Sequence, residues 1–82
     1  MFYVYILRSL KNRRLYTGST NDLKRRLGEH NRGQSKYTKY SGPFELIYKE
    51  ECLTKSEAYK RELFFKTGKG RDFLKSVIVM RE

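Results

Sequence analysis

Residues 2–7, with the sequence Phe-Tyr-Val-Tyr-Ile-Leu, form an unbroken run of aromatic and aliphatic side chains near the start of the chain. The run is long enough for a β-strand and too short for a helix. Alternation along a strand sends successive side chains to opposite faces of a sheet. One face then carries Phe2, Val4 and Ile6, and the other carries Tyr3, Tyr5 and Leu7. Because both sets are largely apolar, we expect an inner strand that is covered on both faces.

The segments that follow predict a second strand and a helix. A turn at residues 10–13 leads into a shorter candidate strand over residues 14–18, which we expect to return antiparallel to the first. Hydroxyl and amide side chains at residues 19–21, followed by Asp22, are typical of a helix start with an acid in the first turn. We expect this helix to cover residues 21–31 and to end before Gly33, which suits a C-terminal cap.

The second half of the chain predicts one more strand and a further helix. Polar and basic residues at 34–41 indicate a loop, after which a third strand is expected over residues 44–50. The spacing of Thr54 and Glu57 is that of a capping box, which predicts a helix to about residue 67. Glycines at 68 and 70 interrupt it, and residues 71–79 fit either a third short helix or a strand.

The order of these segments predicts the fold class. It is an α+β domain of ββαβα(α) type, with a three-stranded, mainly antiparallel sheet flanked by helices. A chain of 82 residues has room for one hydrophobic core, and it contains no internal repeat, linker or low-complexity segment. We therefore expect residues 1–82 to form a single domain, with a monomer favoured although nothing in the sequence determines the oligomeric state.

The charge is the strongest global signal. Nineteen Lys and Arg against nine Asp and Glu give a formal net charge of +10, and the mean hydropathy is −0.82. A charge of this size attracts polyanions and accelerates encounters with them, so nucleic acid is the first candidate partner. An anionic membrane surface is the second candidate, and a role in solubility alone is the third.

Cysteine, histidine and hydropathy patterns exclude several other classes. Cys52 is the single cysteine and His30 the single histidine, so we expect no internal disulfide and no conventional His/Cys metal site. The first residues lack the features of a signal peptide, and no apolar run approaches the roughly 20 residues needed to span a bilayer. We therefore expect a cytoplasmic protein that does not act in a membrane.

Projection of the first helix at 100° per residue places an arginine and the histidine at the edge of the core. Leu23 and Leu27 define the apolar stripe, with His30 and Arg26 beside it and Lys24, Arg25 and Glu29 further out. An arginine at the rim of a buried surface can donate two hydrogen bonds to a phosphate. The alternative is that Arg26 only extends its stem over apolar surface and that His30 is a half-buried helix residue.

The second helix carries a carboxylate within an expected apolar arc. Ala58 and Phe65 lie on one side of Glu62, and Tyr59 and Leu63 lie on the other. A buried carboxylate is costly unless it is paired or bound to a metal. Glu62 is therefore either a ligand for a hard cation such as Mg²⁺ or one partner of an internal ion pair.

Two tyrosines complete the set of candidate residues. Tyr5 and Tyr16 occupy two strands that a tight turn joins, so they could be neighbours on one face of the sheet. They either pack against other side chains or activate a water molecule. Activation would require neighbouring cations to lower a pKa that is ordinarily near 10.

Taken in order along the chain, these residues resemble the signature of the GIY-YIG nuclease family. Val4-Tyr5-Ile6 stands at its first motif and Tyr16-Thr17-Gly18 at its second. Residues 22–30 are similar to its arginine motif, and residues 57–62 to the segment with its metal-binding acid. The resemblance covers residues 2–74 and is greatest to the small stand-alone bacterial members.

The resemblance implies a metal-dependent endonuclease. Glu62 would bind Mg²⁺ or Mn²⁺, and Arg26 would stabilise the charge that develops on the phosphate. Either tyrosine could activate the water; we favour Tyr5 as the base and Tyr16 as the positioning partner, with His30 hydrogen-bonded into the cluster. There are three departures from the family pattern. No glycine flanks Tyr5, serine or threonine replaces the lysine that some members carry after the second motif, and no counterpart of a C-terminal asparagine is evident.

The expected substrate is nucleic acid, with DNA favoured over RNA and a role such as DNA repair. Because contacts to phosphates position a protein without reading bases, we expect low sequence specificity. The residues expected to contact nucleic acid are Arg14, Lys24, Arg25, Arg32, Lys36, Tyr37 and Lys39. The alternative function is a nucleic-acid-binding module with the same fold and little or no catalysis. Docking to anionic membranes is a weaker third possibility.

Overall fold

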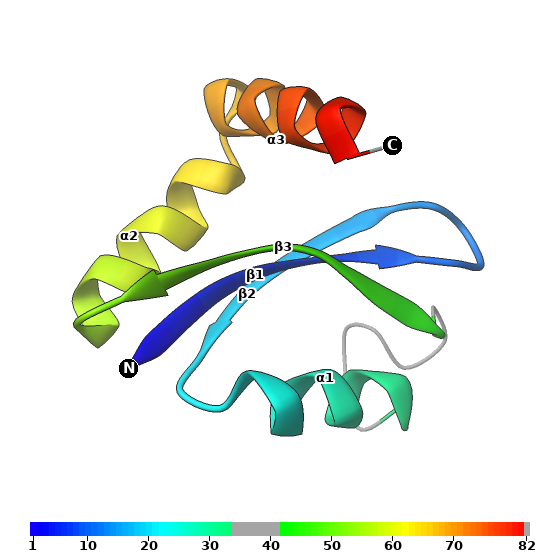
Figure 1. Cartoon of the computed structure of the whole chain (residues 1–82), viewed down its shortest axis with the longest axis horizontal. Coiled ribbons are helices and arrows are strands. Elements are labelled where there is room, and N and C mark those ends of the chain that lie inside the picture. The colour runs from blue at the N-terminus through cyan, green and yellow to red at the C-terminus, as the bar shows by residue number, and fades with distance from the viewer. Residues whose placement is uncertain (34–41, 82) are drawn as a thin grey trace.

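The computed structural model describes residues 1–33 and 42–81, with side chains described as far as residue 77. Its element order is the predicted ββαβα(α), and the fold is α+β with a three-stranded antiparallel sheet (Figure 1). The strands are β1 (Phe2–Ser9), β2 (Leu15–Thr20) and β3 (Phe44–Cys52). The helices are α1 (Leu23–Asn31), α2 (Lys55–Phe65) and α3 (Gly68–Arg81).

The aromatic run at the start of the chain is the central strand of the sheet. The strand order is β2-β1-β3, and both neighbours pair with β1 in the antiparallel direction. Val4 and Ile6 are fully buried on one face, and Tyr5 and Leu7 are buried on the other. The prediction of an inner strand covered on both faces is therefore confirmed.

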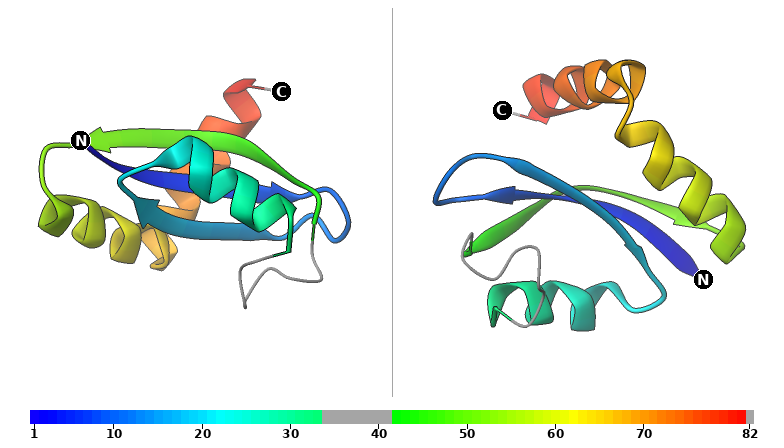
Figure 2. Two further views of the ribbon diagram at one scale, coloured as in Figure 1. Left: turned by 90° about the horizontal axis from the view of Figure 1, so that it is seen from below. Right: turned by 180° about the vertical axis from the view of Figure 1, so that it is seen from behind.

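Helices lie on both faces of the sheet (Figures 1 and 2), and a separate group of side chains packs on each face. Val4 and Ile6 pack with Ala58 and Phe65 of α2 and with Leu74 of α3. On the opposite face, the core comprises Tyr5, Leu7 and Phe44, against which Leu23 and Leu27 of α1 pack. Helix α1 thus lies on one side of the sheet, and α2 and α3 lie on the other.

The start of α1 differs slightly from the prediction. Asp22 is the N-cap, because its side chain accepts a hydrogen bond from the backbone N–H of Arg25 at 3.1 Å. The helix therefore begins at Leu23 and has no acid in its first turn. Its end is as predicted, because Gly33 adopts a φ of 73°, which glycine reaches without steric cost.

The structure after α2 shows which of the two predicted alternatives, a helix or a strand, residues 71–79 adopt. Thr54 caps α2 as predicted, accepting from the backbone N–H of Glu57 at 3.1 Å, but the helix ends at Phe65 rather than near residue 67. The segment after it is a helix, and the glycines are part of it instead of an interruption. A Cβ on Gly70 would lie 2.0 Å from the carbonyl oxygen of Phe64, so only glycine permits this close approach of the two helices.

Among residues 1–33 and 42–81, no helix has the length and apolar character needed to cross a membrane.

Candidate active site

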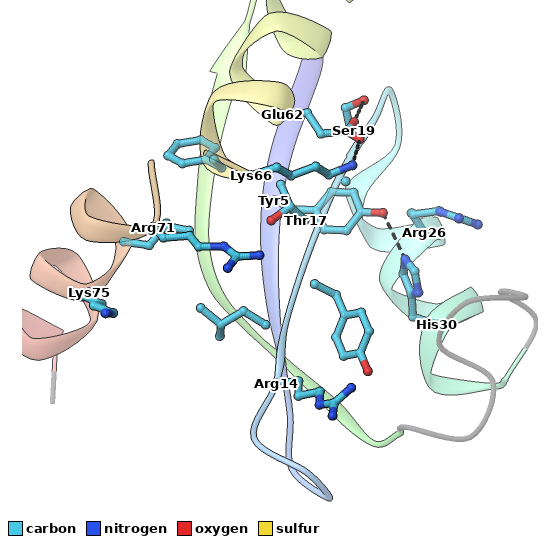
Figure 3. Close-up of a pocket in the computed structure, with 15 residues that line it drawn as sticks. Tyr5, Arg14, Thr17, Ser19, Arg26, His30, Glu62, Lys66, Arg71 and Lys75 are labelled. Carbon is cyan, nitrogen blue, oxygen red and sulfur yellow. Dashed lines mark hydrogen bonds and ion pairs between the residues drawn. The ribbon is translucent and has the colours of Figure 1, made fainter. Parts of the chain in front are cut away.

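Tyr5 is held by the pairing of the central strand with the edge strand. Tyr5 lies opposite Gly18 in the register of β1 and β2, and only 3% of it is exposed. Its hydroxyl lies 3.0 Å from Nε2 of His30 on α1 (Figure 3). A Cβ on Gly18 would lie 2.4 Å from the Tyr5 hydroxyl oxygen, so the tyrosine ring occupies the space that a side chain would need. The glycine of the second sequence motif therefore allows the phenol to reach the sheet edge.

We expect Gly18→Ala to destabilise the protein by about 1–3 kcal/mol, because the added methyl group must displace a buried aromatic ring. Chemical denaturation measures this loss. Gly28→Ala is the matched control, because a Cβ there meets only the flexible end of Arg32 at 3.0 Å. Alanine in a helix interior is favoured by about 0.5–1 kcal/mol over glycine, so the control should be neutral or stabilising. Equal effects of the two substitutions would contradict this account of Gly18.

His30 and Arg26 project from α1 to the same place, as the helical projection predicts. His30 is only 6% exposed, and the Arg26 side chain is half-buried. The Arg26 guanidinium lies 3.2 Å from Oε1 of Glu29. The prediction that Glu29 lies further out than Arg26 is wrong, because the Glu29 side chain is 24% exposed and that of Arg26 is 36%. This ion pair draws Glu29 back onto the helix surface and leaves Arg26 at the rim of the cluster.

Burial determines the protonation states of the phenol and the imidazole. Burial raises the pKa of Tyr5 above 10.0, and the nearby Arg26 guanidinium opposes this rise without reversing it. The lowering of the Tyr5 pKa that activation of water would require is therefore not found. Burial, with the Arg26 charge as a second cause, lowers the pKa of His30 below 6.5, so the imidazole is neutral at pH 7. The hydrogen bond between the Tyr5 hydroxyl and His30 Nε2 therefore joins two neutral groups at pH 7.

The lowered pKa of His30 makes stability depend on pH with a definite sign. Between pH 6.5 and the lower folded value, the unfolded chain binds a proton that the folded protein does not. Stability is therefore complete above about pH 6.5 and falls as the pH is lowered from there. In urea unfolding at about pH 7.5 and about pH 5.5, we expect a larger loss for the native protein than for His30→Gln. The same pH dependence in both proteins would rule out His30 as its source.

Glu62 approaches the site from the other face of the sheet. Its side chain is 17% exposed. It accepts a hydrogen bond from Ser19 Oγ at 2.8 Å and forms an ion pair with Lys66 Nζ at 2.9 Å. The predicted apolar arc around it is wrong on one side, because Tyr59 and Leu63 are exposed at 57% and 46%. Glu62 thus sits at the border between the covered and the open face of α2, not in the middle of a buried stripe.

The cluster of Tyr5, Arg26 and His30 and the Glu62–Lys66 pair meet at a pocket around the edge strand β2. In an antiparallel pair, directly opposite residues share a face, so Tyr5 and Gly18 face α1 whereas Ser19 faces α2. Both sides contribute to one open pocket of about 840 Å³ (Figure 3). Tyr5, Arg26 and His30 line it from one face, and Glu62 and Lys66 line it from the other. The pocket therefore brings together side chains from both layers of the fold.

Tyr16 also lines the pocket, although it is not directly opposite Tyr5. The register pairs it with Leu7, which places it diagonally from Tyr5 on the same face of the sheet. Its ring packs edge-on against Phe44, with 5.3 Å between the ring centroids. The expectation that the two tyrosines share one face is confirmed.

The residues expected to contact nucleic acid divide into three groups. Arg14 lines the pocket, whereas Lys24, Arg25 and Arg32 on and after α1 do not. The remaining three, Lys36, Tyr37 and Lys39, lie outside the described residues.

Sequence reasoning missed three cations that line the pocket: Lys66, Arg71 and Lys75. The i,i+4 spacing of Lys66 from Glu62 is a signal that was present in the sequence. The other two lie on α3, and nothing local in the sequence indicates that α3 reaches the pocket.

The donor set fits a hard divalent cation bound largely through substrate and water. Within the described part of the chain, no three His, Cys, Asp or Glu side chains come together as a metal site. Glu62 is the one carboxylate among the described residues that line the pocket. Mg²⁺ characteristically uses one or two carboxylates and completes its coordination with water and phosphate oxygens. Glu62 could hold such an ion, provided that the Lys66 ammonium leaves its carboxylate.

This α+β fold places a phenol, an imidazole, a guanidinium and a carboxylate beside one edge strand of the sheet. A model of the GIY-YIG catalytic domain matches residues 1–74. The chain belongs to the GIY-YIG family.

Its relatives include small bacterial proteins of similar length. The chain is 45% identical over 76 residues to a UPF0213 protein of Staphylococcus saprophyticus, with 92% of each chain covered. It is 49% identical over 61 residues to a UPF0213 protein of Oceanobacillus iheyensis, covering 73% of this chain and 70% of that one. The solution NMR structure of a UPF0213 protein from Bacillus halodurans is similar, with 37% identity and a TM-score of 0.56, covering 94% of this chain and 85% of that one.

Proposed function

We propose that residues 1–82 form a single GIY-YIG domain that hydrolyses nucleic-acid phosphodiester bonds with Mg²⁺ or Mn²⁺. DNA is favoured over RNA as the substrate, and sequence specificity is low. The observation that carries this proposal is the convergence of the Tyr5–His30 pair, Arg26 and Glu62 on one pocket at the sheet edge. Family membership, which brings a catalytic domain and a nucleic-acid substrate, agrees with it.

Glu62 and Arg26 supply opposite charges on the two sides of the phosphate. Glu62 would hold the divalent cation, which when bound polarises a phosphate oxygen and neutralises developing negative charge. The Arg26 guanidinium, on the opposite wall of the pocket, donates hydrogen bonds to the oxygens where charge accumulates in the transition state. Ser19 orients the Glu62 carboxylate by donating to it at 2.8 Å.

The Tyr5–His30 pair accepts the proton of the attacking water. Tyr5 is protonated at neutral pH, so it acts as a base only if its own proton moves at the same time. His30 is neutral and lies 3.0 Å away. In its Nδ1-protonated tautomer it accepts that proton at Nε2 as the water gives its proton to the Tyr5 oxygen. The water oxygen forms its bond to phosphorus while the bond to the leaving oxygen breaks. Tyr16, diagonal to Tyr5 on the same face, positions the water.

The decisive experiment is an assay of the purified chain with Mg²⁺, with Mn²⁺ and with a chelator, on DNA and RNA in single- and double-stranded form. Metal-dependent cleavage that the chelator abolishes is the expected result, with higher rates on DNA. A pure, folded protein that cleaves none of these substrates with either metal would overturn the proposal.

One observation favours a second candidate, a nucleic-acid-binding module without efficient chemistry. Lys66 forms an ion pair with Glu62 at 2.9 Å, which occupies the carboxylate that the metal would need. Such a module would bind nucleic acid in a strongly salt-dependent way, and binding would survive Glu62→Ala. Binding without cleavage in the assay above would select this candidate.

A further inference from the structure

The pocket continues past the Tyr5 cluster toward α3, where it is strongly cationic. Arg71 and Lys75 of α3 line it on one side of Tyr5, with Arg26 and His30 on the other side (Figure 3). Five Lys or Arg side chains line the pocket against the single carboxylate of Glu62, counted over the described residues. Such an excess of positive charge around one concave surface fits a ligand with more than one negative charge.

Three of these cations are not engaged in holding the fold together. The other two, Arg26 and Lys66, form ion pairs with Glu29 and Glu62. The side chains of Arg14, Arg71 and Lys75, by contrast, form no ion pair or side-chain hydrogen bond with any residue in the described ranges. All three are exposed, so no bond within the protein needs to be broken when they bind an anion.

The arrangement of the three cations follows the edge strand. Arg14 precedes β2 and lies four residues before Gly18, the glycine that faces the Tyr5 hydroxyl. At a rise of about 3.3 Å per residue, this separation is roughly 13 Å along the strand. Arg71 and Lys75 approach the same stretch from α3, on the face of the sheet that Leu15 and Thr17 share. A polynucleotide strand with one phosphate at the Tyr5 cluster would therefore bring its neighbouring phosphates among these cations.

We propose that Arg14, Arg71 and Lys75 form a second anion-binding site, which holds the phosphates next to the hydrolysed one on the same strand. Nucleic acid then runs along the outer edge of β2 toward α3, and not over the exposed cations of α1. The position of the hydrolysed phosphate in this arrangement rests on the proposed function. The existence of the second site rests on the pocket and its unpaired cations alone.

Binding of a fluorescein-labelled DNA oligonucleotide, measured by anisotropy in the presence of EDTA, tests the site without requiring catalysis. We expect Arg71→Ala/Lys75→Ala to weaken binding about tenfold or more. Each lost phosphate contact lowers the slope of log affinity against log salt by about 0.7–0.9, so the slope should become flatter by roughly 1.5. Arg14→Ala should weaken binding further, and Arg71→Lys, which keeps the charge, should retain most of the affinity.

The matched control is Lys55→Ala/Lys60→Ala, which removes two exposed cations from α2 that do not line the pocket. It makes the same change in net charge, so a general electrostatic effect would weaken binding equally in both double variants. Equal losses of affinity, or an unchanged salt slope for Arg71→Ala/Lys75→Ala, would overturn the second site.

A small substrate separates this proposal from the proposed function. Thymidine 5′-p-nitrophenyl phosphate carries one phosphodiester and no neighbouring phosphates, so it reaches only the Tyr5 cluster. With Mn²⁺, we expect the native protein and Arg71→Ala/Lys75→Ala to hydrolyse it at the same rate, whereas Arg26→Ala is slower. An equal slowing by Arg71→Ala/Lys75→Ala would place these residues in the cluster itself and overturn a separate site. If the native protein hydrolyses nothing but the double variant still loses oligonucleotide binding, the proposed function fails and the second site stands.

Discussion

Glu62→Gln is expected to lower metal-dependent hydrolysis by about 10³-fold while the fold is retained. Glutamine has the size of glutamate and can still accept the hydrogen bond that Ser19 Oγ donates at 2.8 Å. It lacks the negative charge that holds a hard cation, and no second carboxylate lines the described part of the pocket to replace it. The loss should therefore appear both in the rate of hydrolysis and in the binding of Mn²⁺.

Initial rates on DNA and a titration with Mn²⁺ measure the two effects, with Glu51→Gln as control. Glu51 is an exposed carboxylate on β3 that does not line the pocket, so its substitution makes the same charge change without touching the site. The lost Glu62–Lys66 pair is an i,i+4 pair with an exposed lysine, which costs only about 0.3–0.5 kcal/mol of stability. A Glu62→Gln protein that keeps native rates, or native Mn²⁺ affinity, would remove Glu62 from the mechanism.

Arg26→Ala has the second largest expected effect, a fall in kcat/KM of about 10²–10³-fold. Arg26 is the one arginine of α1 that lines the pocket, and its charge acts on both Tyr5 and His30. In the proposed mechanism, its removal takes away the hydrogen bonds and charge that stabilise the transition state. It also removes a cation that opposes the rise in the pKa of Tyr5. The lost stabilisation of the transition state and the further rise in the pKa of Tyr5 are both expected to lower kcat/KM.

Two further variants distinguish these consequences. Arg26→Ala leaves the Glu29 carboxylate without its partner at 3.2 Å, which by itself would disfavour a phosphate in the pocket. Arg26→Ala/Glu29→Gln removes that carboxylate charge, and its rate should stay low if Arg26 acts directly on the substrate. Arg26→Lys keeps a positive charge but loses the planar fork, so an intermediate rate is expected. Recovery of the native rate in the double variant would show that the loss of rate in Arg26→Ala came from the Glu29 carboxylate alone.

Much of the fold follows from short-range patterns. The alternation over residues 2–7 predicted which side chains of the central strand share a face, and the structure buries Val4 and Ile6 on one face and Tyr5 and Leu7 on the other. The caps at Thr54 and Gly33 were predicted because they involve bonds or dihedral angles within one turn of chain. The α3 segment was left open between helix and strand, because its Val-Ile-Val run suits either and its two glycines suggest a break. The structure has a helix there, Gly68–Arg81, which begins with the close approach of Gly70 to Phe64, a contact that local sequence does not reveal.

The residues of the candidate site also divide into those that local sequence patterns placed correctly and those that they did not. Helical periodicity placed Arg26 and His30 on the inner side of α1, and both line the pocket. The same periodicity failed for Tyr59 and Leu63, because it identifies an apolar arc without telling how much of that arc the sheet covers. It also gave no sign of Lys75, since α3 joins the pocket only through its angle to α2.

The surroundings of Tyr5 show most clearly what the sequence determines and what it does not. The sequence alone determined the two motifs, their order along the chain and the fold class, because motif spacing and hydrophobic alternation are properties of neighbouring residues. Only the tertiary structure decided that Gly18 lies opposite Tyr5 and that the phenol is hydrogen-bonded to His30. It also decided that burial raises the pKa of Tyr5 instead of allowing Arg26 to lower it. Strand register, desolvation and the joining of two faces around β2 arise from contacts between residues far apart in the chain, and these come into being only when the layers pack together.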